Sequence, residues 1–126
     1  MEMNIVENNV KKFKNIKRGN IIWAKLEGRG SVTQGVRPLV VVGNNKGNAF
    51  SPVILCTPIT STVKKKLLPT QVFLEGNESY GLKKDGIIMT EQLVTVDKTS
   101  ILDVAGSLPY QLMENVNKAL KISLAL

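Results

Sequence analysis

The chain contains no histidine and only one cysteine among its 126 residues. Histidine is the commonest general acid–base side chain and the commonest metal ligand, and zinc sites are built mainly from His and Cys. We therefore expect no zinc site, no histidine-based catalysis and no internal disulfide. Any catalysis has to use Arg, Lys, Glu, Asp, Tyr, Ser or Thr.

Long apolar runs are also missing. No stretch approaches the roughly 18 apolar residues that a membrane span needs, and residues 1–4 lack the basic and apolar regions of a secretory signal. Cys56 lies in the apolar stretch Val53-Ile54-Leu55-Cys56-Thr57, which favours a small buried side chain over a reactive thiol. These features predict a cytoplasmic protein with reduced cysteine and no membrane contact.

Acidic residues are few, with 10 Asp and Glu against 17 Lys and Arg, and the net charge is +7. This excess favours an acidic partner such as nucleic acid, an anionic membrane face or an acidic protein. A charge that only keeps the protein in solution is the other interpretation. Charge alone does not separate the two.

The length is that of one domain, and the patterning predicts a mainly β fold with a helix at each end. Met3, Val6, Val10 and Phe13 fall at helical spacing and predict a short amphipathic helix within 2–16. A second helix is expected from Pro109 onward, with Ser107 as its N-cap. A polar, glycine-bearing loop is expected at 27–37 and a flexible loop at 43–48. The strand-like segments are 21–26, 39–42, 52–58, 70–75, 86–89, 92–96 and 101–104.

About six or seven short strands closed by a terminal helix indicate a small, strongly curled antiparallel sheet or half-open barrel. No phosphate-binding loop, dinucleotide motif, nucleophile elbow or metal-ligand spacing is present, so no cofactor is predicted. The candidate polar residues are instead at strand ends, where loops of a small barrel bring side chains together. They are Arg37, Thr60 and Gln92.

Each candidate has a structural alternative. Arg37 offers a planar, permanently charged group suited to phosphate, but it could also form a surface salt bridge. Thr60 could satisfy nearby backbone, and Gln92 could simply begin a strand. Lys64, Lys65 and Lys66 form either a phosphate-binding surface or a solvated loop. Among the aromatic residues, Trp23 and Phe73 are expected in the core and Phe50, in a loop, is the candidate for base stacking.

The order of short motifs along the chain resembles the MazF/PemK toxin family from about Lys17 to the C-terminal helix. The motifs are Lys17-Arg18-Gly19-Asn20-Ile21, Gly30-Ser31, Gly35-Val36-Arg37-Pro38, Phe50-Ser51-Pro52, Pro58-Ile59-Thr60-Ser61, Leu68-Pro69-Thr70, Asp85-Gly86-Ile87-Ile88, Glu91-Gln92-Leu93 and Val96-Asp97-Lys98. This resemblance divides the chain into an N-terminal amphipathic extension, 1–16, and a toxin domain, 17–126.

The resemblance implies an SH3-like barrel of the CcdB/Kid/MazF kind that acts as a homodimer. It also implies a metal-independent endoribonuclease toxin that cleaves single-stranded mRNA to 2′,3′-cyclic phosphate and 5′-hydroxyl ends and is neutralised by an acidic, MazE-like antitoxin. In the family pattern Arg37 and Thr60 are catalytic. The RNA-binding residues expected from the resemblance and its neighbouring loops are Arg29, Ser31, Thr33, Gln34, Asn44, Lys64 and Gln92.

The chain departs from the family pattern at two places. Asn20 stands where the family often has aspartate, and Val32, Thr33 and Gln34 replace a Glu-Gln-Gly sequence. The second change removes an acidic group near Arg37, so we expect the RNA preference of this chain to lie in that loop. Two other functions on the same fold stay open: a non-enzymatic, CcdB-like protein poison and a basic nucleic-acid-binding module.

Overall fold

The computed structural model describes residues 4–62 and 64–126. Its strands are β1 (Asn20–Leu26), β2 (Gly35–Val41), β3 (Val53–Thr60), β4 (Gln71–Leu74), β5 (Gly86–Met89), β6 (Val94–Asp97) and β7 (Ile101–Ser107). Its helices are α1 (Ile5–Lys12), α2 (Asn45–Phe50) and α3 (Tyr110–Leu124), with 3-10 turns η1 (Glu78–Tyr80), η2 (Thr90–Gln92) and η3 (Lys98–Ser100). Within the described ranges, none of the helices has the length and apolar character needed to cross a membrane.

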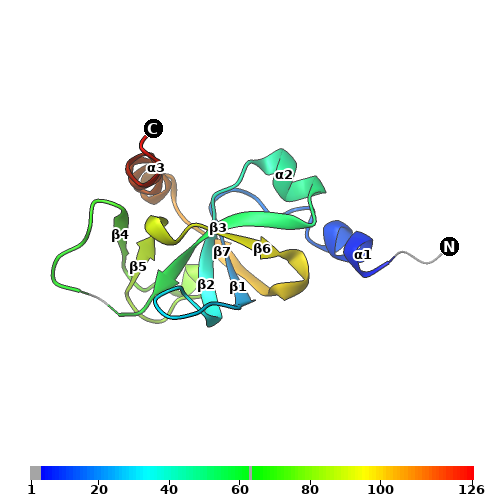
Figure 1. The fold of residues 1–126 in the computed structure, drawn as a ribbon, viewed down its shortest axis with the longest axis horizontal. Helices are drawn as coiled ribbons and strands as arrows, with labels where there is room; N and C mark the ends of the chain where they lie inside the picture. Colours follow the sequence, from blue (N-terminus) through cyan, green and yellow to red (C-terminus); the bar gives the residue numbers. More distant parts are fainter. Residues whose placement is uncertain (1–3, 63) are drawn as a thin grey trace.

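The strands form one antiparallel sheet in the order β4-β5-β3-β2-β1-β7, and β6 pairs with β3 beside this path. Strand β3 is the branching point: its Val53–Cys56 half pairs with β6, and its last two residues pair with β5. The sheet therefore bends strongly at β3 and curls without closing (Figure 1). The predicted fold class is confirmed, with an open curled sheet rather than a closed barrel.

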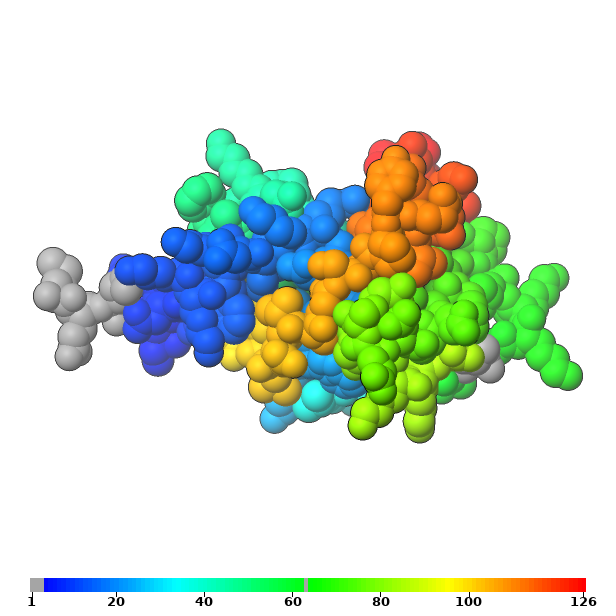
Figure 2. Space-filling model, turned by 180° about the vertical axis from the view of Figure 1, so that it is seen from behind, coloured from blue at the N-terminus to red at the C-terminus, as the bar shows by residue number. Residues whose placement is uncertain are grey.

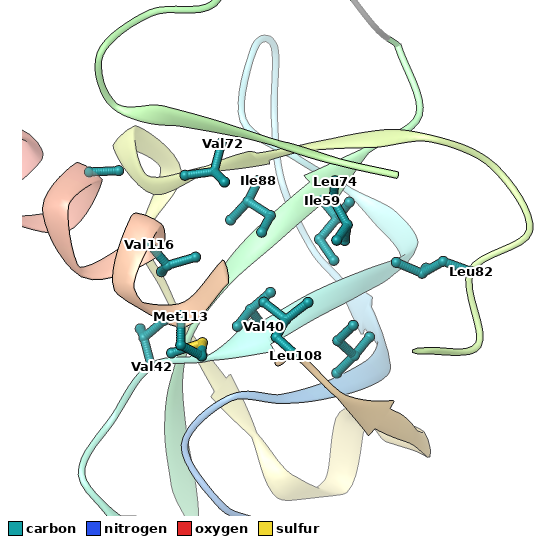
Figure 3. Packing of buried hydrophobic residues seen from close by; sticks show 12 residues of the cluster. Val40, Val42, Ile59, Val72, Leu74, Leu82, Ile88, Leu108, Met113 and Val116 are labelled. Carbon is teal, nitrogen blue, oxygen red and sulfur yellow. The ribbon is translucent and has the colours of Figure 1, made fainter. Parts of the chain in front are cut away.

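Two clusters of buried side chains lie on opposite faces of the curled sheet. The first packs β2, β3, β4 and β5 against α3, whose Met113 and Val116 face Val40 and Ile88 (Figure 3). This contact follows from the helical spacing of the apolar residues in α3, which gives the helix one apolar face. The second cluster joins β1, β2, β3 and β6 around Leu39, and Cys56 is fully buried in it, as predicted.

The segment 43–48 is not the flexible loop that the sequence suggested. Asn44 caps α2 by accepting a hydrogen bond from the Gly47 N–H at 2.8 Å. Asn48 is buried, and its side chain donates to the Gly43 carbonyl oxygen at 2.9 Å. Polar residues here satisfy the ends of a short helix, because Asn is a strong N-cap residue.

The expected ends of two other elements are also wrong. Ser107 does not cap α3: it ends β7, where its hydroxyl oxygen accepts from Asn20 Nδ2 at 2.7 Å, and the cap position of α3 is Pro109. Gln92 does not begin a strand but ends η2.

Phe73, expected in the core, is on the outer face of β4 with 43% of its surface exposed.

Helix α1 lies at one end of the molecule, away from β4, and contacts α2 and η3 (Figures 1 and 2). Its predicted apolar stripe is only partly covered: Val6 is exposed, Val10 and Phe13 are half-buried, and Met3 lies outside the described residues. The following residues attach it, because Ile16 is buried in the second cluster and Phe13 packs against it. The helix is therefore joined to the sheet through its C-terminal connection.

Candidate active site

A pocket of about 490 Å³ opens where the first residues of β2 meet the end of β3 and the loop before β5. Arg37 lines it from β2 and Thr60 from β3. These strands pair antiparallel with Leu39 opposite Pro58, and the same register continued for two residues sets Arg37 opposite Thr60. Directly opposite residues of an antiparallel pair have their side chains on the same face of the sheet, and both predicted catalytic residues line the pocket.

Arg37 is an exposed side chain held by a rigid strand. Its Nη1 donates to the carbonyl oxygen of Val36 at 3.1 Å, and it forms no ion pair with any residue that the structure describes. The alternative of a surface salt bridge therefore does not apply to this structure. The remaining N–H groups of the guanidinium are available for an anion, which they suit by geometry and charge.

Thr60 is half-buried at the last position of β3, and its Oγ1 accepts a hydrogen bond from the backbone N–H of Thr62 at 3.2 Å. The proposed backbone role of this hydroxyl is thus observed. A hydroxyl group both accepts and donates, so this bond leaves the O–H proton able to point to a ligand in the pocket.

Two cationic residues of the pocket, Lys83 and Lys84, were missed in the sequence. Lys83 and Lys84 line the pocket from the loop before β5 and add two cations to Arg37, while the carboxylate Oδ1 of Asp85 accepts from the Gly76 N–H at 2.8 Å and closes that loop. The Lys-Lys pair directly before the Asp85-Gly86 motif was the available signal. Trp23, expected in the core, is half-buried and forms part of the pocket wall.

The loop 27–34 next to the pocket is bound to Gln92. The Oε1 atom of Gln92 accepts from the Thr33 N–H at 2.7 Å and from Thr33 Oγ1 at 2.6 Å. Its Nε2 donates to the Ser31 carbonyl oxygen at 3.1 Å. Three of the predicted RNA-binding residues, Ser31, Thr33 and Gln92, are thus brought together.

The other predicted RNA-binding residues are spread out. Arg29 and Gln34 are exposed in the loop 27–34, and Lys64 is exposed in the segment before β4. Asn44 caps α2, which follows the far end of β2 from that loop (Figure 1). None of these four residues lines the pocket, and neither do Ser31, Thr33 and Gln92, so RNA contact stays a prediction for all seven.

The pocket combines the Arg37 guanidinium, two lysine ammonium groups, the hydroxyls of Thr60, Ser61 and Thr62, and the Asp85 carboxylate. Across residues 4–62 and 64–126, no group of three or more His, Cys, Asp or Glu side chains is arranged to hold a metal ion. Burial raises the pKa of the Cys56 thiol to about 12, and this residue lies in the core outside the pocket. Positive charge, hydrogen-bond donation and one carboxylate acceptor are therefore the chemistry that these side chains offer.

A curled antiparallel sheet with one helix across a face and a cationic pocket at its strand ends defines a class of small, mainly β proteins suited to an anionic substrate. Residues 17–124 match the family of PemK-like, MazF-like toxins of type II toxin–antitoxin systems. The chain belongs to this family.

Similar proteins of established name agree with this assignment. The chain is 40% identical over 112 residues to "Endoribonuclease EndoA" of Bacillus subtilis, covering 88% of this chain and 96% of the relative. It is 37% identical over 112 residues to "Endoribonuclease MazF" of Staphylococcus saprophyticus, covering 88% and 92%.

Solved structures share the fold at lower identity. MazF from Deinococcus radiodurans superimposes with a TM-score of 0.75 at 18% identity, covering 88% of this chain and 97% of that one. A mycobacterial endoribonuclease in complex with its cognate antitoxin gives a TM-score of 0.71 at 23% identity, covering 88% and 96%. These likenesses confirm the curled sheet with its terminal helix.

Proposed function

We propose that this chain is an endoribonuclease toxin that cleaves single-stranded RNA in the pocket between β2 and β3. The observation that carries the proposal is that Arg37 and Thr60 line the same pocket, in a member of a family whose curated relatives are named endoribonucleases. Lys83 and Lys84 extend the positive charge of the pocket toward the RNA backbone.

The chemistry follows from what the pocket provides. The substrate supplies the nucleophile: its 2′-oxygen bonds to the adjacent phosphorus, and the bond from phosphorus to the 5′-oxygen breaks. The products are a 2′,3′-cyclic phosphate and a 5′-hydroxyl, so the proton leaving the 2′-hydroxyl is matched by one gained at the 5′-oxygen. This route requires no metal and no protein nucleophile.

Arg37 binds the non-bridging oxygens of the phosphorus and stabilises the charge that grows on them. It is a poor proton donor or acceptor, since guanidinium stays protonated in proteins. Thr60 donates a hydrogen bond to the same developing oxyanion, and removal of one such donor typically costs ~10²–10³ in rate.

The partners we propose are single-stranded mRNA, a second copy of the chain in a homodimer and an acidic MazE-like antitoxin. A net charge of +7 complements an acidic chain, and one structure of similar fold is a complex with its cognate antitoxin. A cytoplasmic location fits these partners.

The test is cleavage of a mixed-sequence RNA by purified protein in excess EDTA, with cut sites mapped and 5′ ends identified by direct labelling with a polynucleotide kinase. Arg37→Ala should abolish cleavage and Arg37→Lys should restore little, because an ammonium cannot form the two-point contact. Lys46→Ala, on exposed α2, is the matched loss of charge outside the pocket and should cleave normally. Cleavage only with added Mg²⁺ would contradict the mechanism, and toxicity of Arg37→Ala in cells with intact RNA would favour a protein poison.

A further inference from the structure

The side-chain amide of Gln92 has only one possible orientation in this structure. The Thr33 N–H can only donate and the Ser31 carbonyl oxygen can only accept, so Oε1 has to face Thr33 and Nε2 has to face Ser31. The usual ambiguity between the oxygen and nitrogen of an amide is thereby removed.

The hydrogen-bonding capacity of Gln92 is almost fully used. An amide oxygen has two lone pairs, and the Thr33 N–H and the Thr33 hydroxyl occupy both. One of the two Nε2 hydrogens is bound to the Ser31 carbonyl oxygen. A single N–H group remains, and Gln92 can present to a ligand one donor and no acceptor.

The hydroxyl of Thr33 donates to the second lone pair of Gln92 Oε1. Thr33 is one of the loop residues at which this chain departs from its family's pattern. The two side chains are half-buried and come from positions 59 apart in the sequence. A residue without a hydroxyl at position 33 would leave the amide oxygen free to accept a hydrogen bond from RNA.

The loop is also closed upon itself at Gly28. A Cβ atom at this position would lie 2.5 Å from the Thr33 carbonyl oxygen and 2.9 Å from that of Val32, both of them backbone atoms. The two ends of the loop therefore touch where Gln92 binds it. Strand β2 follows immediately, so this closure determines how the backbone enters the strand that carries Arg37.

We propose that Thr33 and Gln92 form a latch that holds the loop 27–34 closed, and that Thr33 is a positioning residue which restricts Gln92 to donating one hydrogen bond to the substrate. The base beside Gln92 then has to present an acceptor, a carbonyl oxygen or an unprotonated ring nitrogen. The statement about the base depends on the proposed ribonuclease function, whereas the latch does not.

The latch is tested without RNA by limited proteolysis, because Arg29 is an exposed trypsin site inside the loop. The rate of cutting after Arg29, followed by fragment mass, reports the opening of the loop when opening is fast relative to cleavage. Thr33→Val keeps the shape and removes the hydroxyl, and we expect cutting about fivefold faster for the loss of one hydrogen bond. Gln92→Met removes all three bonds and should speed cutting by on the order of a hundredfold.

Two matched variants separate the latch from general destabilisation. Thr33→Ser retains the hydroxyl and should be cut at the wild-type rate. Ser31→Ala leaves the main-chain carbonyl oxygen in place and should also be cut at that rate. Urea unfolding of each variant shows whether global stability has changed. Equal cutting rates for Thr33→Val and wild type, or an increase in Ser31→Ala as large as in Thr33→Val, would overturn the latch.

The restriction on the base is tested by mapping cut sites in one mixed-sequence RNA. Thr33→Val should cut a broader set of sites, since the freed oxygen of Gln92 can also accept from a base, and Thr33→Ser should keep the wild-type set. An unchanged set of sites in Thr33→Val, with its loop shown open by trypsin, would overturn this part. If wild-type protein leaves RNA intact while the proteolysis results hold, the proposed function fails and the latch stands.

Discussion

Replacement of Arg18 by methionine should destabilise the protein without affecting the pocket. The Arg18 side chain joins the end of β2 to α3: its Nε donates to the Val42 carbonyl oxygen at 2.8 Å, and its Nη2 donates to Asn117 Oδ1 at 2.6 Å. Methionine keeps the unbranched aliphatic stem and removes both donors. The Arg18 backbone N–H, which donates to Asn45 Oδ1 at 2.7 Å, is unchanged by the substitution.

The size of the effect follows from the two lost bonds. Hydrogen bonds to charged groups contribute ~1.5–3 kcal/mol when sheltered from water and less when exposed, and Arg18 is exposed. Val42 is buried, so its carbonyl oxygen would lose a partner where water is scarce. With about 1 kcal/mol for each bond, Arg18→Met should lower the free energy of unfolding by about 2 kcal/mol.

Urea unfolding followed by circular dichroism measures this loss. All variants need the same protein concentration, because any dimer makes stability depend on concentration. Lys17→Met is the matched control: its side chain is exposed, and it should change stability by less than ~0.5 kcal/mol. Arg18→Lys should be intermediate, since one ammonium reaches one acceptor. A loss for Arg18→Met no larger than that for Lys17→Met would refute the reasoning.

Three further predictions concern other parts of the fold. Because burial raises the pKa of Cys56 to about 12, its thiol should resist thiol reagents at mildly alkaline pH in the native protein and react fully in denaturant; fast labelling of native protein would contradict this. Gly28→Ala should open the loop and speed trypsin cutting at Arg29, because its Cβ would overlap backbone atoms. Gly30→Ala is the comparison: Gly30 has φ at +57°, and a Cβ added there would have no atom within 4 Å. This variant should strain the backbone but keep the loop closed. Burial lowers the pKa of Lys98 below its usual 10.5. At pH values between the lowered pKa and 10.5, the unfolded chain therefore binds more protons than the folded protein. The free energy of unfolding rises with pH in this window. Lys98→Met should flatten that rise in a pH series of urea titrations, and an unchanged slope would count against it.

The mainly β fold could be predicted because it depends on local patterns. Continuous apolar segments such as 39–42 indicate strands buried on both faces, and the spacing from Leu112 to Leu124 indicates a helix with one apolar face. Short motifs in a fixed order identified the family, and with it Arg37 and Thr60. The prediction was wrong at a polar segment. The helix Asn45–Phe50 was interpreted as a loop, because its Asn and Gly content resembles that of a turn.

The sequence by itself therefore determined the class of fold, the family and two of the side chains that line the pocket, Arg37 and Thr60. Only the tertiary structure decided that Lys83 and Lys84 join them and that Trp23, which packs against the first core cluster, also lines the pocket. It also decided that Gln92 is bound to the loop through Ser31 and Thr33, from positions 61 and 59 residues away. Patterns of hydrophobicity report burial of neighbouring residues, whereas such contacts depend on where the curling of the sheet brings distant loops together.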